Sequence, residues 1–191
     1  MTRLALAFAF LVVAISAAPA AAIRIVAFGD SATSGWLVPH DQAYPAQLQK
    51  RLRAKGYDVT VKNAGVPGDT TAGALKRFDL AIDPDTAIAI VEFGTNDLRS
   101  GASMKTLHAR LTELIRSLRA RHIEVLVVGL GKLDLADVAL ANDALYVQWK
   151  LPRGKYRARD GAHFNAEGYS ILVGQMLPQV VTLIRRLQVV P

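Results

Sequence analysis

Four short segments of the chain contain the residue types that acyl transfer requires. They read G-D-S-A-T-S-G at residues 29–35, N-A-G-V-P-G-D-T-T at 63–71, G-T-N-D at 94–97 and D-G-A-H-F-N at 160–165. Acyl transfer needs a nucleophile, a base, a group that orients the base, and hydrogen-bond donors for the oxyanion. The four segments supply a residue for each of these parts, so the sequence predicts a serine hydrolase.

Each residue of the predicted site suits one step of that chemistry. Ser31 is a hydroxyl on a glycine-flanked turn, which can hold it exposed, and His163 can accept its proton. Asp160 precedes the histidine closely and can fix the imidazole tautomer. Gly68 can offer its backbone N–H with no side chain in the way, and Asn96 can add a side-chain N–H. The alternative for these residues is a structural role in helix caps and turns.

The elements that must position these segments alternate between strands and helices. Apolar runs that end in polar or glycine-rich segments are typical of buried strands, and apolar residues three and four apart are typical of helices. The predicted strands are Ile23–Phe28, Tyr57–Val61, Thr86–Phe93 and Glu124–Val128, and the predicted helices are Pro45–Lys55, Thr70–Phe78, Ser103–Arg121 and Asn165–Leu187, the last one capped by Asn165.

This alternation predicts an α/β fold, a three-layer α/β/α sandwich with a mainly parallel, flavodoxin-like sheet. Ligands of such sheets bind beyond the carboxyl ends of the strands. Three of the four segments follow a predicted strand, and the fourth precedes the last helix. We therefore expect Ser31 and His163 to meet at one edge of the sheet.

The four segments, in this order, resemble those of the SGNH or GDSL-type hydrolases, and most closely the small bacterial branch of thioesterases, lysophospholipases and arylesterases. The resemblance covers nearly all of the chain from Ile25 to the last helix. It implies an esterase or thioesterase that works without a cofactor. It also implies that Ser31 is the nucleophile, that Asp160 and His163 complete the triad, and that the Ser31 N–H, the Gly68 N–H and the Asn96 side chain form the oxyanion hole.

Two features depart from the family pattern. Ala32 stands where the family often has leucine, at a packing position. The stretch from Gly129 to Asp160 is shorter than the corresponding segment of the thioesterase relatives, so their acyl-chain specificity is not carried over and a fifth strand is left open. Within it, Ala136–Ala144 is compatible with a helix, and Leu145–Trp149 with a strand or a continuation of that helix. A short segment predicts an open site that prefers short acyl esters, roughly acetate to hexanoate.

The first 22 residues have the form of a secretory signal. Arg3 is followed by an apolar run over residues 4–15 and by small residues with one proline up to Ala22. We expect cleavage before Ile23, which gives a signal peptide at 1–22 and one hydrolase domain at 23–191. The product is then exported, either periplasmic or secreted. The alternative is an uncleaved membrane anchor, for which the apolar run is short.

Composition limits the range of partners. The net charge is +7, spread over helix-like stretches, and the chain has no cysteine. No nucleic-acid recognition motif accompanies the charge, so we expect a small-molecule ester or thioester substrate and no nucleic acid. Transient contact with anionic lipid stays open, as does the oligomeric state.

Three acidic residues lie beside the predicted site, namely Asp30, Asp69 and Asp97. Turn and cap hydrogen bonding is their expected role, and no metal site is predicted. A cluster of these carboxylates around magnesium or calcium is the alternative, and it would favour a metal-dependent phosphoesterase. A non-catalytic exported binding module on the same fold is the other competing function.

Overall fold

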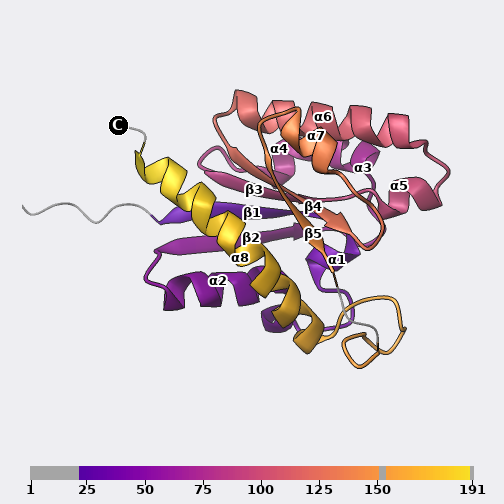
Figure 1. Cartoon of the computed structure of the whole chain (residues 1–191), viewed down its shortest axis with the longest axis horizontal. Coiled ribbons are helices and arrows are strands. Elements are labelled where there is room, and N and C mark those ends of the chain that lie inside the picture. Colours follow the sequence, from indigo (N-terminus) through magenta and orange to yellow (C-terminus); the bar gives the residue numbers. More distant parts are fainter. Residues whose placement is uncertain (1–21, 151–153, 190–191) are drawn as a thin grey trace, which may run out of the picture.

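A parallel five-stranded sheet forms the centre of the fold (Figure 1). The computed structural model describes residues 22–150 and 154–189. The strand order is β2-β1-β3-β4-β5, and every strand runs parallel to its neighbours. The strands are β1 (Ile23–Gly29), β2 (Val59–Gly65), β3 (Ile88–Glu92), β4 (Glu124–Leu130) and β5 (Leu145–Trp149). Helices cover both faces of this sheet, which confirms the predicted three-layer α/β class.

The helices alternate with the strands along the chain. They are α1 (Ser31–Ser34), a 3-10 turn at His40–Gln42, α2 (Tyr44–Ala54), α3 (Thr71–Lys76), α4 (Phe78–Ala81), α5 (Thr95–Arg99), α6 (Met104–Ala120), α7 (Ala136–Leu140) and α8 (Ala166–Val189). The Asn165 side chain accepts a hydrogen bond from the Gly168 N–H at 2.9 Å. This bond confirms the predicted cap of the last helix.

Two apolar cores lie on opposite faces of the sheet. Successive side chains of a strand point to opposite faces, so Ile25 of β1 packs into one core and Val26 into the other. Helices α2 and α8 close the first core, with buried residues such as Leu48 and Leu172. Helices α3, α4, α6 and α7 close the second, with Leu111 among its buried residues. The sheet is therefore covered on both faces, as its nearly continuous apolar strands predict.

The second strand lies further along the chain than predicted. We expected Tyr57–Val61, but β2 begins at Val59 and continues to Gly65, paired residue by residue with β1. Tyr57 instead closes the end of α2, because its N–H donates to the Leu52 carbonyl at 3.2 Å. The strand runs on through polar residues because β2 lies at the edge of the sheet, where side chains reach solvent.

Two further segments differ in detail from the sequence-based expectation. The helix expected over Thr70–Phe78 is broken at Arg77 into α3 and α4. Of the stretch 136–144 that is compatible with a helix, residues 136–140 are helical, and Leu145–Trp149 is a strand that pairs in parallel with β4. A fifth strand, on which the short segment 129–160 allowed no prediction, is therefore present, and it lies at the edge of the sheet opposite β2.

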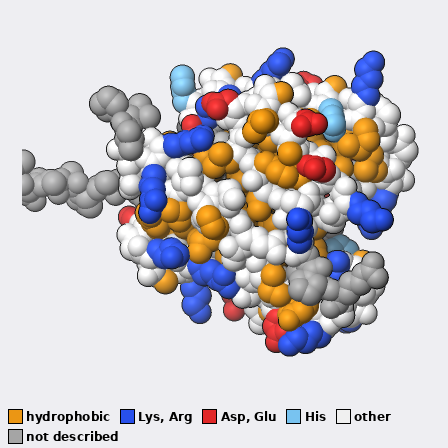
Figure 2. Space-filling view, viewed as in Figure 1, with side chains coloured by type: hydrophobic (Ala, Val, Ile, Leu, Met, Phe, Trp, Pro, Cys, Tyr) orange, Lys and Arg blue, Asp and Glu red, His pale blue; other side chains and the backbone are white. Residues whose placement is uncertain are grey.

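Positive charge is distributed over the surface, and part of it is paired. On the face shown in Figure 2, Lys and Arg side chains are scattered over several elements. Arg119 pairs with Glu124 at 2.7 Å and with Asp143 at 2.6 Å, and Lys62 pairs with Asp83 at 2.8 Å. Such pairs at the protein surface contribute about 0–1 kcal/mol each. Part of the positive charge therefore belongs to ordinary ion pairs on the solvated surface.

The amino-terminal segment is the least described part of the chain. The predicted signal at residues 1–22 lies, apart from Ala22, outside the described residues. No helix within 22–150 and 154–189 has the combination of length and apolarity that crossing a bilayer requires.

Candidate active site

Ser31 begins α1, and one residue separates it from the inner strand β1. Asp30 caps this short helix, because its Oδ1 accepts a hydrogen bond from the Ala32 N–H at 2.9 Å. Gly29 allows the helix to sit close to the sheet, since a Cβ there would lie 2.0 Å from Thr33 Oγ1. The tight strand-to-helix turn thus places the Ser31 hydroxyl at the carboxyl edge of the sheet, as predicted.

His163 bridges the serine and an aspartate. Its Nε2 lies 2.9 Å from Ser31 Oγ, and its Nδ1 lies 2.5 Å from Asp160 Oδ2. The other Asp160 oxygen accepts the backbone N–H groups of Ala162 and His163, both at 3.0 Å. The bond from His163, together with these backbone donors, lowers the pKa of Asp160 to about 2. The carboxylate is therefore ionised at neutral pH and holds a proton on Nδ1, which leaves Nε2 facing the serine as an acceptor.

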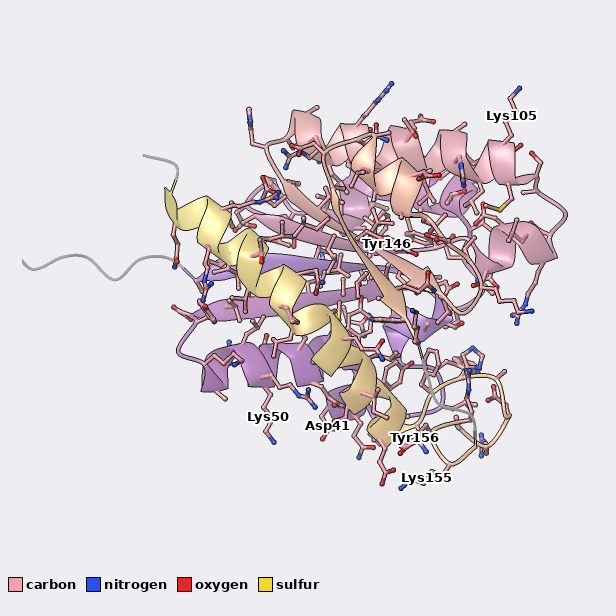
Figure 3. All side chains as sticks on the ribbon, viewed as in Figure 1. Asp41, Lys50, Lys105, Tyr146, Lys155 and Tyr156 are labelled. Carbon is pink, nitrogen blue, oxygen red and sulfur yellow. The ribbon has the colours of Figure 1, made fainter. Side chains whose placement is uncertain are left out.

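The segment that carries the acid and the histidine is anchored to the sheet beside α8. Its two arms form an antiparallel bridge between Arg157 and Phe164, and the Ala158 N–H donates to the His163 carbonyl at 2.9 Å. Phe164 is buried and packs edge-to-face against Trp149 of β5. Figure 3 shows this segment to the right of the lower end of α8, with Lys155 and Tyr156 marking its start. The buried phenyl ring thus fixes the position of the neighbouring histidine.

The expected oxyanion donors lie on three different elements. Ser31 is the first residue of α1, where a backbone N–H has no acceptor within the helix. Gly68 lies in the turn after β2 with φ +79°, and its N–H donates to no described residue. A Cβ there would meet nothing within 4 Å, so the positive φ, rather than space, favours glycine.

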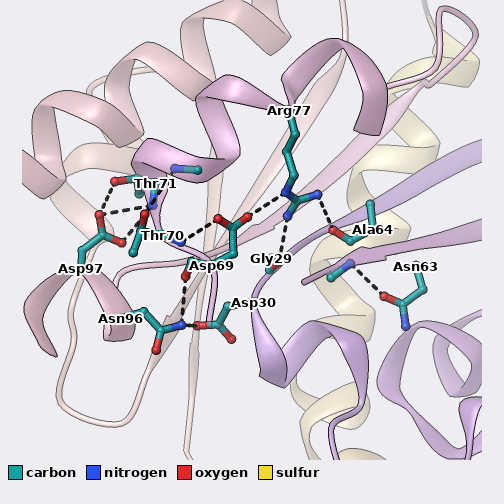
Figure 4. Close-up of polar contacts among 12 residues, drawn as sticks. Gly29, Asp30, Asn63, Ala64, Asp69, Thr70, Thr71, Arg77, Asn96 and Asp97 are labelled. Atoms are coloured by element: carbon teal, nitrogen blue, oxygen red, sulfur yellow. Dashed lines mark hydrogen bonds and ion pairs between the residues drawn. The ribbon is translucent and has the colours of Figure 1, made fainter. Parts of the chain in front are cut away.

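Asn96 is held near these donors, but its amide is engaged. Its Nδ2 donates to Asp30 Oδ2 at 2.8 Å and to the Asp69 carbonyl at 2.9 Å (Figure 4). Two hydrogen bonds use both hydrogens of the amide group. Donation from Asn96 to a substrate oxygen therefore requires that one of these bonds be shared or exchanged.

The neighbouring acidic residues have structural contacts. Asp69 accepts from the Thr70 N–H at 2.9 Å and pairs with Arg77 at 2.7 Å. Asp97 is fully buried and accepts from both the N–H and the hydroxyl of Thr71, so it joins α5 to α3 instead of capping its own helix. Among the described residues, no three His, Asp or Glu side chains are arranged to hold a metal ion.

A small cavity of about 60 Å³ opens at the Ser31–His163 pair. The sequence identified several of its residues, but not Arg99 and Leu130, which also line it. Arg99 lies one helical turn after Asn96, and no described carboxylate pairs with it. Because residues three apart share a helix face, this spacing could have placed Arg99 beside Asn96 in the predicted site. Leu130 ends β4 and carried no chemical signal.

Comparisons with known proteins agree with this architecture. Esterase TesA of Pseudomonas aeruginosa is 36% identical over 112 residues, which cover 58% of this chain and 56% of TesA. An arylesterase of Vibrio mimicus is 33% identical over 102 residues, which cover 53% and 51% of the two chains. The chain thus matches about half the length of these curated relatives.

Among solved structures, AlinE4, described as an SGNH-hydrolase family esterase, is 31% identical with a TM-score of 0.68. The match covers 86% of this chain and 98% of AlinE4. The model of the GDSL-like lipase/acylhydrolase family matches residues 27–149, which is more than half of the chain. The resemblance predicted from the four segments is confirmed, and the protein belongs to the GDSL-like lipase/acylhydrolase family.

Proposed function

We propose that this protein hydrolyses carboxylic esters and thioesters through an acyl-enzyme on Ser31. The observation that carries the proposal is the continuous chain of hydrogen bonds from Ser31 Oγ through His163 to Asp160, at 2.9 and 2.5 Å. The Ser31–His163 distance lies within the range expected of a nucleophile and its base, and the shorter His163–Asp160 contact joins the base to the group that orients it. Family membership, together with relatives that are named esterase and arylesterase, supports the same reaction class.

The geometry supports a two-step reaction. Ser31 Oγ attacks the carbonyl carbon while His163 Nε2 takes the hydroxyl proton. When the tetrahedral intermediate collapses, the bond to the leaving alcohol or thiol breaks, and the imidazolium returns that proton to it. A water molecule then repeats the sequence on the acyl-enzyme and releases the carboxylic acid and free Ser31. Asp160 stays ionised throughout and stabilises the imidazolium.

The negative oxygen of each intermediate needs donors. The Ser31 and Gly68 N–H groups and the Asn96 amide are assigned this role. Each such donor contributes about 2.7–4 kcal/mol to lowering the barrier. Because the Asn96 amide is shared with Asp30 and Asp69, its donation to substrate accompanies a change in those contacts.

Substrate size is constrained by the small cavity. A space of about 60 Å³ beside the nucleophile accommodates a short acyl group, and a longer chain would lie on the open surface. Each CH₂ contributes about 0.8 kcal/mol only where protein covers it. Short-chain esters are therefore the proposed substrates. The guanidinium of Arg99 at the rim favours substrates with a negative group on that side.

Export is the remaining part of the proposal. A cut before Ile23 leaves β1 complete, because β1 begins at that residue. The amine of Ile23 would retain its contact with the Asp58 carbonyl, which the Ile23 N–H makes at 2.9 Å. The mature hydrolase would then be periplasmic or secreted.

The nucleophile is tested with Ser31→Ala and with Ser34→Ala as the matched control in the same helix. Ser31→Ala should abolish hydrolysis of p-nitrophenyl acetate and labelling by a fluorophosphonate probe, while the folded circular dichroism spectrum is kept. Ser34→Ala should retain both, since its hydroxyl donates only to the Ser31 carbonyl, at 3.1 Å. Labelling of another residue in Ser31→Ala would refute the assignment, and wild type that binds but never turns over esters would favour a binding module.

A further inference from the structure

A buried glutamate lies directly beneath the nucleophile helix and takes no part in the chemistry described above. Glu92 is the last residue of β3 and is 1% exposed. It stands opposite Gly29 in the register of β1 and β3, so its side chain lies next to the turn that leads to Ser31. A carboxyl group seldom lies in so buried a position without a partner.

The partners of Glu92 are hydroxyl and carboxyl groups. Thr33 Oγ1, on α1, donates to Glu92 Oε2 at 3.0 Å, and Tyr44 OH lies 3.5 Å from the same hydroxyl. On its other side lies Asp30, which directly follows Gly29, the register partner of Glu92, and is 3% exposed. Among the described residues, no Lys or Arg forms an ion pair with either carboxyl group.

Two adjacent buried carboxyl groups without a cation cannot both be ionised, so they share a proton. Burial raises the pKa of Glu92 well above its ordinary value, and the neighbouring Asp30 charge raises it further. Burial also raises the pKa of Asp30, but three donors stabilise its ionised form, namely the Ala32 N–H, the Asn96 amide and, more weakly at 3.5 Å, the Ser31 hydroxyl. The proton therefore resides mainly on Glu92.

We propose that Glu92 is a positioning residue that stays protonated at neutral pH and donates a hydrogen bond to the Asp30 carboxylate. Asp30, held in this way, fixes the start of α1 and the Asn96 amide, while the other Glu92 oxygen accepts from Thr33. Glu92 thus holds both ends of the nucleophile helix. A neutral acid that is kept protonated by its surroundings serves as a hydrogen-bond donor in other active sites. This inference rests on the proposed function for its effect on catalysis, but not for the protonation state.

The catalytic test compares Glu92→Gln with Glu92→Leu. Glutamine keeps a neutral group that can donate to Asp30 and accept from Thr33, so Glu92→Gln should hydrolyse p-nitrophenyl acetate within a few-fold of the wild-type kcat. Leucine removes both bonds, and the resulting shift of Ser31 and Asn96 should lower kcat about a hundredfold with little change in KM. Equal losses in the two variants would overturn the positioning role.

The protonation state has a test that needs no substrate. Titratable groups that face Glu92 are Asp30, Tyr44 of α2 and Tyr169 of α8, and His163 acts on Asp30. Burial raises the pKa of both tyrosines, so they stay neutral. Infrared difference spectroscopy at neutral pH should show the C=O band of a protonated carboxyl group in wild type and no such band in Glu92→Gln.

The matched control is Glu124→Gln, the same substitution at the opposite end of the neighbouring strand β4. Glu124 pairs with Arg119 and Arg186 there, so its replacement should leave the infrared band and kcat unchanged. Loss of the band in Glu124→Gln, or its persistence in Glu92→Gln, would overturn the proposal.

Stability gives a second readout. Between the pKa of an unfolded Glu, about 4.3, and the raised pKa in the fold, the folded state binds more protons than the unfolded state, so wild type loses stability as pH rises. Glu92→Gln has no titrating group at this position, so it does not lose stability in this way as pH rises. Its free energy of unfolding relative to wild type should therefore increase from about pH 5 to about pH 8. A difference that stays constant with pH would show that Glu92 is ionised, and this result stands whether or not Ser31 is the nucleophile.

Discussion

His163 Nε2 lies 2.9 Å from Ser31 Oγ although 132 positions of the chain separate the two residues. The contact joins the turn after β1 to a segment anchored by Phe164 next to α8. The parallel sheet explains it, because the segments that follow its strands all emerge at one edge.

Removal of the base or of its orienting acid should be costly. His163→Ala should lower kcat by about a thousandfold or more, as in other triads. Asp160→Asn should also be damaging, because the amide can stabilise the wrong tautomer. Steady-state kinetics on p-nitrophenyl acetate measures both losses. Near wild-type activity in Asp160→Asn would point to another acid. Asp134 is a less suitable one, because its carboxylate accepts a hydrogen bond from the Ala136 N–H at 3.0 Å.

The pH dependence of Asp160 has a defined sign. Its pKa in the fold is lowered to about 2, so its contribution to stability is present above the unfolded value of about 3.9 and is lost as pH falls through 2. Between about pH 5 and pH 9 the carboxylate does not titrate. The ionised carboxylate is lost only at acidic pH, so the difference in unfolding free energy between wild type and Asp160→Asn should shrink below about pH 4. Denaturant unfolding at several pH values between about 2 and 6 checks this, and a difference that does not shrink below about pH 4 would contradict it.

Gly68 can be tested against a glycine with the same backbone strain. Gly68→Ala places a side chain at φ +79° and Gly56→Ala places one at φ +87°, and neither Cβ meets an atom within 4 Å. Both should cost about 1–2 kcal/mol of unfolding free energy. Only Gly68→Ala should also lower kcat, because its N–H would turn away from the oxyanion. Equal kcat in the two variants would remove Gly68 from the oxyanion hole.

Acyl-chain preference follows from the cavity of about 60 Å³. The value of kcat/KM should be highest for esters from acetate to hexanoate and should not rise toward palmitate, because an open surface covers few of the added CH₂ groups. A series of p-nitrophenyl esters at low salt measures this. A steady rise with chain length would reveal an acyl groove.

Processing is tested by sequencing the amino terminus of exported material. Expression of the full chain in a bacterial host should yield a mature protein that begins near Ile23, since residues 1–22 have the three parts of a signal. Recovery of the intact chain in the membrane fraction would instead support the anchor alternative.

The parts of the fold and site that the sequence predicted are those with a strong local pattern. Apolar runs identified β1, β3 and β4, and the polar segments after them identified Ser31 and Asn96. The start of β2 was predicted two residues too early. Tyr57 and Asp58 belong to the alternating pattern, but Tyr57 closes the end of α2 and the strand begins at Val59. Glu92 escaped notice because periodicity indicates that a residue is buried but does not indicate its partners, which come from the distant Asp30 and Thr33.

The division of the site between the two ends of the chain also has a consequence for biosynthesis. A ribosome completes β1, and with it Ser31, long before it adds Asp160 and His163. Until the closing segment has docked beside α8, the serine has neither its base nor the Phe164 packing that places the base. With the proposed triad, a nascent or still unfolded chain would therefore be unable to hydrolyse esters. The proposed activity would arise only once the segment with Asp160 and His163 has docked onto the sheet.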